Sequence, residues 1–161
     1  MTDIGTTTTQ SEFSDFMAAY QKRRDLKKVL ASINAKSLFE AFVQTNITSV
    51  EVEFDGAGDS GQIEQITPYR EAEICDWPTC EINIQDLDMN GGGVLISLDM
   101  QKAIEALCYD FLEDREGGWE NNDGAYGTFS FDVAARTVTL DFNARYTAVE
   151  NTAYHIEAGE I

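Results

Sequence analysis

Residues 99–146 read DMQKAIEALCYDFLEDREGGWENNDGAYGTFSFDVAARTVTLDFNARY, and this stretch decides the fold of the chain. Apolar side chains recur at helical spacing through its first half, which predicts an amphipathic helix over residues 100–116 with Asp99 as the N-cap. The following glycine pair, Gly117-Gly118, ends that helix by allowing a left-handed conformation. Apolar and polar residues then alternate over residues 125–133 and 137–146, which predicts a β-hairpin. The predicted core of this helix-and-hairpin unit comprises Ile104, Leu107, Phe111, Phe129, Phe131, Leu140 and Phe142.

Further strands are predicted on either side of this unit. Val50, Val52 and Phe54 alternate with acidic residues, which is typical of a half-buried strand. The strands predicted outside the unit cover residues 47–55, 62–67, 81–84 and 153–157, and residues 94–98 form either another strand or the lead-in to the helix. Hairpins without strand–helix–strand alternation imply antiparallel pairing. We therefore predict an α+β fold: an antiparallel sheet of about five to six strands with N-terminal helices and one central helix packed on one face.

The N-terminal region is predicted to be helical after a threonine-rich, flexible segment, residues 1–10. Residues 11–161 are expected to form a single α+β domain. Ser11 or Ser14 suits the helix N-cap, and the spacing of apolar residues after it is helical. The pattern fits one long helix or two joined near Arg24, followed by a short helix over residues 36–45.

Charge is the most unusual property of the composition, with a formal net charge of −18. Residues 1–36 hold six basic and four acidic side chains, for a net charge of +2. Residues 37–161 hold five basic and 25 acidic side chains, for a net charge of −20. Such a body repels nucleic acid and anionic membranes and attracts basic protein surfaces. Direct binding to nucleic acid or to a membrane is therefore not expected.

The first residues lack the cationic start and the apolar run of a signal peptide. No segment approaches the ~18 apolar residues that a membrane-spanning helix needs. The three cysteines are an odd number and are not needed as disulfides in a chain of this length. A reducing, cytoplasmic location is expected.

Motifs for catalysis or metal binding are weak. Asp86, Asp88 and Asn90 match the opening of a calcium-binding EF-hand loop, but Ser97 stands where the bidentate glutamate is required. An ordinary Asp/Asn/Gly turn is therefore favoured. The four residues that could hold zinc have unsuitable spacing and context: Cys75, Cys80, Cys108 and His155. With no nucleophile, phosphate-binding or dinucleotide motif, we predict a non-enzymatic protein without a cofactor.

The acidity itself suggests a function. Several rows of carboxylates on a helix and on strands begin to approach the charge density of nucleic acid. We predict an inhibitor of antirestriction or anti-CRISPR type that binds the basic groove of a nucleic-acid enzyme. The alternatives are an immunity-type protein that neutralises a basic toxin and a calcium-dependent binding module. The predicted partner-binding residues are Glu51, Glu53, Asp55, Asp110, Glu113, Asp114, Glu116, Trp119, Glu120, Asp123 and Tyr126.

Two segments of the chain resemble a known family. The first is VEVEFDGAGDSG at residues 50–61, and the second begins with GWENNDG at residue 118 and runs to Tyr146. They resemble a family of small uncharacterised acidic bacterial proteins that are often encoded on mobile elements. The resemblance spans residues 47–157 and implies no known activity, so no site residue is transferred from it. The mobile-element association favours the inhibitor hypothesis.

Overall fold

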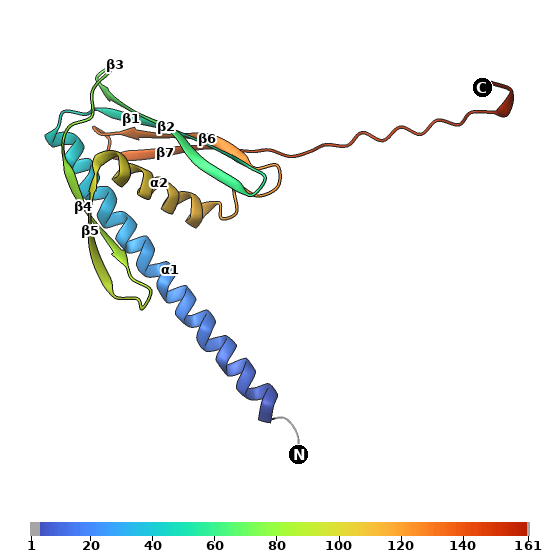
Figure 1. The fold of residues 1–161 in the computed structure, drawn as a ribbon, viewed down its shortest axis with the longest axis horizontal. Helices are drawn as coiled ribbons and strands as arrows, with labels where there is room; N and C mark the ends of the chain where they lie inside the picture. Colours follow the sequence, from blue (N-terminus) through green and yellow to red (C-terminus); the bar gives the residue numbers. More distant parts are fainter. Residues whose placement is uncertain (1–3, 161) are drawn as a thin grey trace.

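The computed structural model describes residues 4–160, which form an α+β fold with two helices and two antiparallel sheets (Figure 1). The five-stranded sheet has the strand order β3-β2-β1-β6-β7, and β4 pairs with β5 in a separate two-stranded sheet. The main elements are α1 (Ile4–Gln44), β1 (Ser49–Ala57), β2 (Ser60–Arg70), β3 (Glu73–Ile74), β4 (Glu81–Leu87), β5 (Gly93–Asp99), α2 (Met100–Arg115), β6 (Ala125–Asp132) and β7 (Thr137–Ala144).

The predicted helix-and-hairpin unit is confirmed as α2, β6 and β7. Asp99 caps α2, because its carboxylate accepts a hydrogen bond of 2.8 Å from the backbone N–H of Lys102. At the other end the N–H of Glu116 donates to the carbonyl of Leu112. β6 and β7 pair antiparallel in continuous register from Ala125–Ala144 to Asp132–Thr137.

The sheet differs from the prediction in extent and number. β2 runs to Arg70, beyond the predicted end at residue 67, and the short strand β3, which was not predicted, pairs with its end. The strands β4 and β5 do not join the five-stranded sheet; they form a hairpin against α1. The prediction of one sheet with five to six strands is therefore corrected to a five-stranded sheet and a separate two-stranded one.

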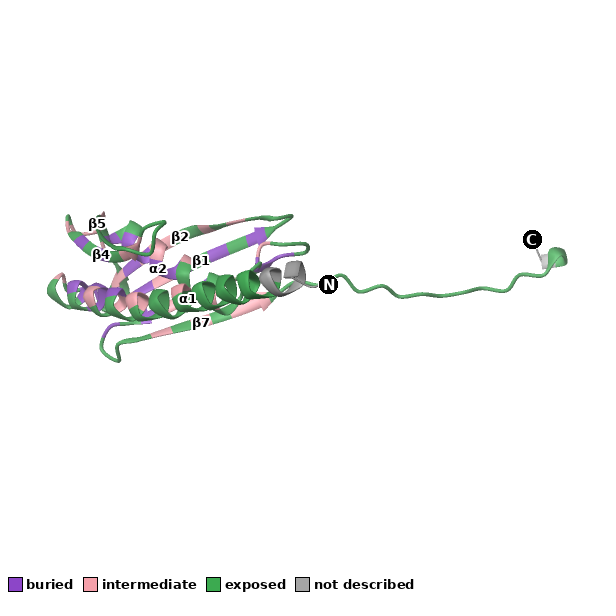
Figure 2. Cartoon of the chain, turned by 90° about the horizontal axis from the view of Figure 1, so that it is seen from below, coloured by how far each residue is buried: buried purple, intermediate pink, exposed green. Residues whose placement is uncertain are grey.

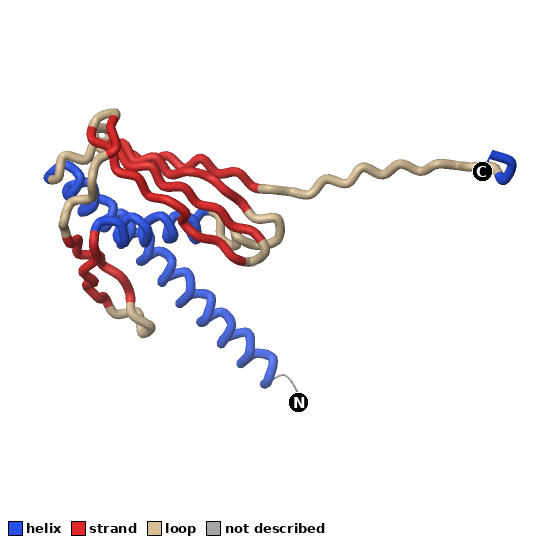
Figure 3. Tube along the Cα trace, turned by 45° about the horizontal axis from the view of Figure 1, so that its top comes forward, coloured by secondary structure: helices blue, strands red, loops and turns tan. Residues whose placement is uncertain are grey.

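One face of the five-stranded sheet forms the core. Val50 lies opposite Phe131 and Val52 opposite Phe129 across β1 and β6, and all four side chains are buried. Phe42 of α1 packs on Phe131 with ring centroids 6.1 Å apart. Both helices lie on this side of the sheet, as Figure 3 shows. The opposite face of the sheet therefore points to solvent.

The helix α1 is a single 41-residue helix with no break near Arg24 and no separate helix over residues 36–45. Ser11 and Ser14 lie inside it, so neither is an N-cap. The helix includes residues 4–10, and residues 1–3 lie outside the described residues. Residues that face the rest of the protein near the end of α1, such as Leu38 and Phe42, are buried, while the N-terminal part of the helix extends past both sheets (Figures 1 and 2).

After β7 the chain is extended and exposed up to a short 3-10 helix, Ala158–Glu160. The strand predicted over residues 153–157 is absent, since these residues lie beyond the sheet and have no neighbouring strand to pair with (Figure 1). Ile161 lies outside the described residues. Neither described helix is both long and apolar enough to cross a membrane.

Candidate protein-binding surface

The uncovered face of the five-stranded sheet brings several of the predicted site residues together. Pairing across the strands places Glu53 of β1 between Gln65 of β2 and Thr128 of β6, and Thr128 is followed by Asp141 of β7. Two parallel rows are centred on Glu51 and Asp55. We call this surface the open face; its residues are Glu51, Glu53, Asp55, Gln62, Gln65, Thr67, Tyr126, Thr128, Ser130, Asp132, Thr139, Asp141 and Asn143.

The open face is acidic because the strands β1, β6 and β7 contain no lysine or arginine. One of its carboxylates is neutralised: Asp55 pairs with Arg145 at 2.9 Å. The Arg145 guanidinium also lies over the ring of Tyr126, with 4.7 Å between its carbon and the ring centroid. Among the described residues, the other open-face carboxylates form no ion pair. They are Glu51, Glu53, Asp132 and Asp141.

The carboxylates of α2 fall into two groups. The Asp114 carboxylate faces α1 and lies 3.5 Å from Nη2 of Arg24 and 3.7 Å from Nζ of Lys28. Desolvation by burial raises the pKa of Asp110, nearby Lys27 opposes this shift, and Asp86 adds to it. Glu113 and Glu116 remain exposed. The basic part of α1 therefore contacts the acidic body of its own chain, and it pairs with one of the predicted partner-binding carboxylates, Asp114.

A cleft of about 880 Å³ separates α1 from α2. Cations from α1 and carboxylates from α2 line it together, so it has no dominant sign of charge. Its charged lining residues are Arg24, Lys27, Lys28, Asp110, Glu113, Asp114 and Arg115. This mixture suits contact between the two helices better than capture of a charged ligand.

Trp119 does not present its ring to solvent. Its side chain is only 9% exposed, and its ring meets Phe54 edge-to-face with centroids 5.4 Å apart. The backbones of Gly56 and Gly61 lie directly against the indole, where a Cβ on either glycine would collide with it. The prediction that Trp119 anchors a partner is therefore wrong. Tyr126, at 46% exposure, is the accessible aromatic residue of this pair.

The loop between α2 and β6 ties the end of the sheet together. The N–H of Asp59 in the β1–β2 turn donates to the carbonyl of Glu120. The Asp123 carboxylate accepts a hydrogen bond of 2.7 Å from the hydroxyl of Thr147. Glu120 is half-buried, and Asp123 is exposed. Both predicted residues thus lie at the end of the sheet and not on the open face.

The predicted residues consequently do not form one patch. Glu51, Glu53, Asp55 and Tyr126 share the open face, whereas those of α2 lie in the helical layer on the other side of the sheet. Asp132 and Asp141 join the first group and were not predicted as site residues. Their alternation with core residues was visible in the sequence. Their position beside Glu53 follows only from strand register.

The residues proposed for calcium form a tight hairpin turn. One carboxylate oxygen of Asp88 accepts the backbone N–H groups of Asn90 at 2.9 Å and Gly92 at 2.8 Å. This is the hydrogen bonding of an Asp turn between two strands, and no helix precedes it as in an EF-hand.

The residues proposed for zinc lie in different environments, one buried in the core and another on the exposed tail. Burial raises the pKa of the Cys108 thiol, and Glu105 adds to the shift. His155 lies on the exposed tail beside Glu157. Within the described part of the chain, no three His, Cys, Asp or Glu side chains are grouped as metal ligands. The structure thus gives neither metal hypothesis support.

A comparison with protein-family models finds one match, described as a family of unknown function (DUF6878), over residues 30–156. This match covers most of the chain. The chain belongs to the DUF6878 family. The predicted kinship with an uncharacterised family is thereby confirmed, whereas bacterial origin and a mobile-element setting stay predictions. Comparisons with curated proteins and with solved structures gave no match.

The DUF6878 match includes both sheets, α2 and the last part of α1, residues 30–44. It therefore includes the whole open face. The half of α1 that extends away from the sheets precedes residue 30 and lies outside the match.

Proposed function

We propose that this DUF6878 protein is a non-enzymatic acidic inhibitor whose open face occupies a basic, nucleic-acid-binding groove of another protein. One observation carries the proposal: a helix-free sheet face bears carboxylates from β1, β6 and β7, and these strands contain no cation. The expected partner is a nucleic-acid enzyme of the kind that antirestriction or anti-CRISPR proteins inhibit.

The spacing of charges favours recognition of a few basic side chains. Residues on one face of a strand repeat every ~6.7 Å, and adjacent strands lie about 4.8 Å apart. Glu53 and Asp141 are two strands apart, so their backbones are separated by about 10 Å. Duplex DNA carries a charge per ~1.7 Å of its axis, so the open face is less dense than DNA. Affinity would therefore come from a few ion pairs together with the polar surface between them.

Competition with DNA tests this proposal. The chain is immobilised, host lysate is passed over it at low and at moderate salt, and bound proteins are challenged with duplex DNA. We expect a nucleic-acid-binding protein that is retained more strongly at low salt and is released by DNA. Failure of DNA to release any retained protein would show that mimicry is wrong.

Matched variants locate the surface. Glu53→Gln with Asp141→Asn removes two exposed charges from the open face. Glu113→Gln with Glu116→Gln removes two exposed charges from α2. We expect the first pair to weaken retention of the partner about tenfold or more and the second pair to change it little. If both double variants lost retention equally, net charge alone would explain binding, and this result would contradict a site on the open face.

Tyr126 favours a second candidate, an immunity-type protein that neutralises a basic toxin. Exposed tyrosine is a frequent interface anchor, and Arg145 holds this ring at one end of the open face. In that case Tyr126→Ala would abolish binding to one tight partner, and DNA would not compete. Trp119→Ala cannot make this test, because Trp119 belongs to the core.

A further inference from the structure

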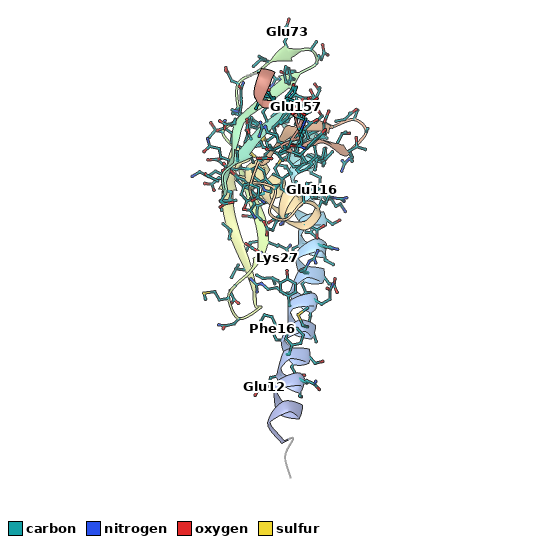
Figure 4. The ribbon with its side chains drawn as sticks, turned by 90° about the vertical axis from the view of Figure 1, so that its right-hand side faces the viewer. Glu12, Phe16, Lys27, Glu73, Glu116 and Glu157 are labelled. Atoms are coloured by element: carbon teal, nitrogen blue, oxygen red, sulfur yellow. The ribbon has the colours of Figure 1, made fainter. Side chains whose placement is uncertain are left out.

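The first half of α1 carries an exposed apolar stripe. Phe13 is 66% exposed, Phe16 65%, Met17 44% and Tyr20 51%. The four residues follow the spacing i, i+3, i+4, i+7 and so lie on one face of the helix. Figure 4 shows Phe16 and Glu12 on the part of α1 that extends past the sheets. An apolar stripe of this size on a charged, isolated helix marks a contact surface.

The stripe continues the face by which α1 packs on its own body. At 100° per residue, Phe13, Met17 and Tyr20 align with the later positions Ala31 and Leu38. Leu38 is fully buried and Ala31 partly buried against the body. The same helix face is thus covered downstream and exposed upstream, where Tyr20 already lines the cleft toward α2. Among the described residues, most of the stripe surface remains open to solvent.

We propose that a second copy of this chain covers the stripe, with the two α1 helices antiparallel and the two-fold axis passing between Phe16 and Met17. The spacing of the stripe is symmetric about that point. Phe13 of one copy then lies opposite Tyr20 of the other, and Phe16 lies opposite Met17. An isologous contact of this kind requires a self-complementary surface, and the stripe provides one.

Charge complementarity supports the antiparallel direction. Glu12 and Arg23 lie on the same flank of the stripe, about 20° apart around the helix. Arg23 donates a hydrogen bond of 2.9 Å to the carbonyl of Asp88 through one of its nitrogens, and a guanidinium has further N–H donors for a carboxylate. In the antiparallel pair, Glu12 of one copy and Arg23 of the other lie on adjacent flanks, offset by about 3 Å along the axis at 1.5 Å per residue. Two symmetric Glu–Arg pairs therefore flank the apolar contact. In a parallel pair, Glu12 of one copy and Arg23 of the other would be offset by about 16.5 Å along the axis, too far apart to pair.

The acidic bodies also favour the antiparallel direction. Residues 37–161 carry a net charge of −20 in each copy. Antiparallel pairing of the extending segments puts the bodies at opposite ends of the paired helices, separated by several Debye lengths of about 8 Å. Parallel pairing would place them side by side. The inference does not depend on the proposed function, because the open face lies on the side of the sheet away from the helices.

Sedimentation velocity of the full chain tests the proposal, from low micromolar to several hundred micromolar in moderate salt. We expect a reversible monomer–dimer equilibrium in this range, since the contact is small. Phe16→Glu should abolish the dimer. The matched control is Val29→Glu on the opposite side of the same helix, where the native side chain is also exposed, at 57%; it should leave the dimer intact.

A charge exchange tests the direction of the helices. Glu12→Arg and Arg23→Glu should each weaken dimerisation about tenfold, because each sets like charges against each other twice. The double variant should restore the wild-type dissociation constant. A chain that stays monomeric at every concentration overturns the proposal, as does a dimer that survives Phe16→Glu. A double variant that is no better than the single ones overturns the antiparallel arrangement.

Discussion

At the end of the sheet, Trp119 is buried and contributes to stability, whereas Tyr126 is exposed and available to a partner. Trp119 fills the space above Gly56 and Gly61 and packs on Phe54. We expect Trp119→Ala to lower the free energy of unfolding by about 3–5 kcal/mol, because it leaves a large cavity. Urea denaturation measures this change. Tyr126→Ala is the control and should cost about 1 kcal/mol or less, since that ring is exposed and has its cation–π contact at the surface. Equal effects of the two substitutions would contradict the assignment.

Asp110 gives a pH-dependent prediction at the same scale. Its pKa is raised in the folded protein, chiefly by burial, so the folded state binds this proton more tightly than the unfolded chain does. The contribution of Asp110 to stability is therefore lost as pH rises from the ordinary aspartate value of about 3.9 through the raised value. Asp110→Asn should raise the melting temperature at neutral pH, and the gain should vanish below about pH 3.9. A loss of stability at neutral pH would show that the attraction to Lys27 dominates.

At the scale of elements, Asn34 joins α1 to the β4–β5 hairpin. Its buried amide donates to the carbonyl of Gln85 at 2.9 Å and accepts the N–H of Gln85 at 2.8 Å. Asn34→Ala leaves both backbone groups unpaired, at about 1–3 kcal/mol each. Relative to the wild-type chain, we expect Asn34→Ala to accelerate amide hydrogen exchange in β4 and β5 and to change it little in β1 and β6. Ser32→Ala, at an exposed position of the same helix, should leave exchange unchanged. Unaltered exchange in Asn34→Ala would show that apolar packing alone holds the hairpin.

At the scale of the whole molecule, we expect repulsion between carboxylates to determine how stability depends on salt. Added salt weakens two opposing effects: repulsion within the acidic body and the attraction of Arg24 and Lys28 for Asp114. The two exposed pairs contribute about 0.2–1 kcal/mol each, which is small beside the repulsion of a chain with a net charge of −18. The melting temperature should therefore rise between low and moderate salt. A flat or falling melting temperature would contradict this balance.

Local patterns in the sequence determined the elements of this protein. The spacing of apolar residues located α2 to within a residue at its C-terminal end and identified the β6–β7 hairpin, because helical and strand periods are properties of the chain itself. The same alternation correctly placed Glu51, Glu53 and Asp55 opposite the core face of β1. Charge density and membership of an uncharacterised family were likewise available from the sequence.

Only the tertiary structure decided which of these features meet. Glu53 and Asp141 share a face because β6 lies between their strands, an order set by contacts far apart in the chain. Trp119 is buried because the β1–β2 turn closes over it, and Asp114 is paired because α1 runs past α2. Periodicity gives each side chain a face within its own element. The identity of the neighbouring element depends on how the apolar faces are buried together. That arrangement separates the open face from Asp114, the carboxylate that pairs with α1.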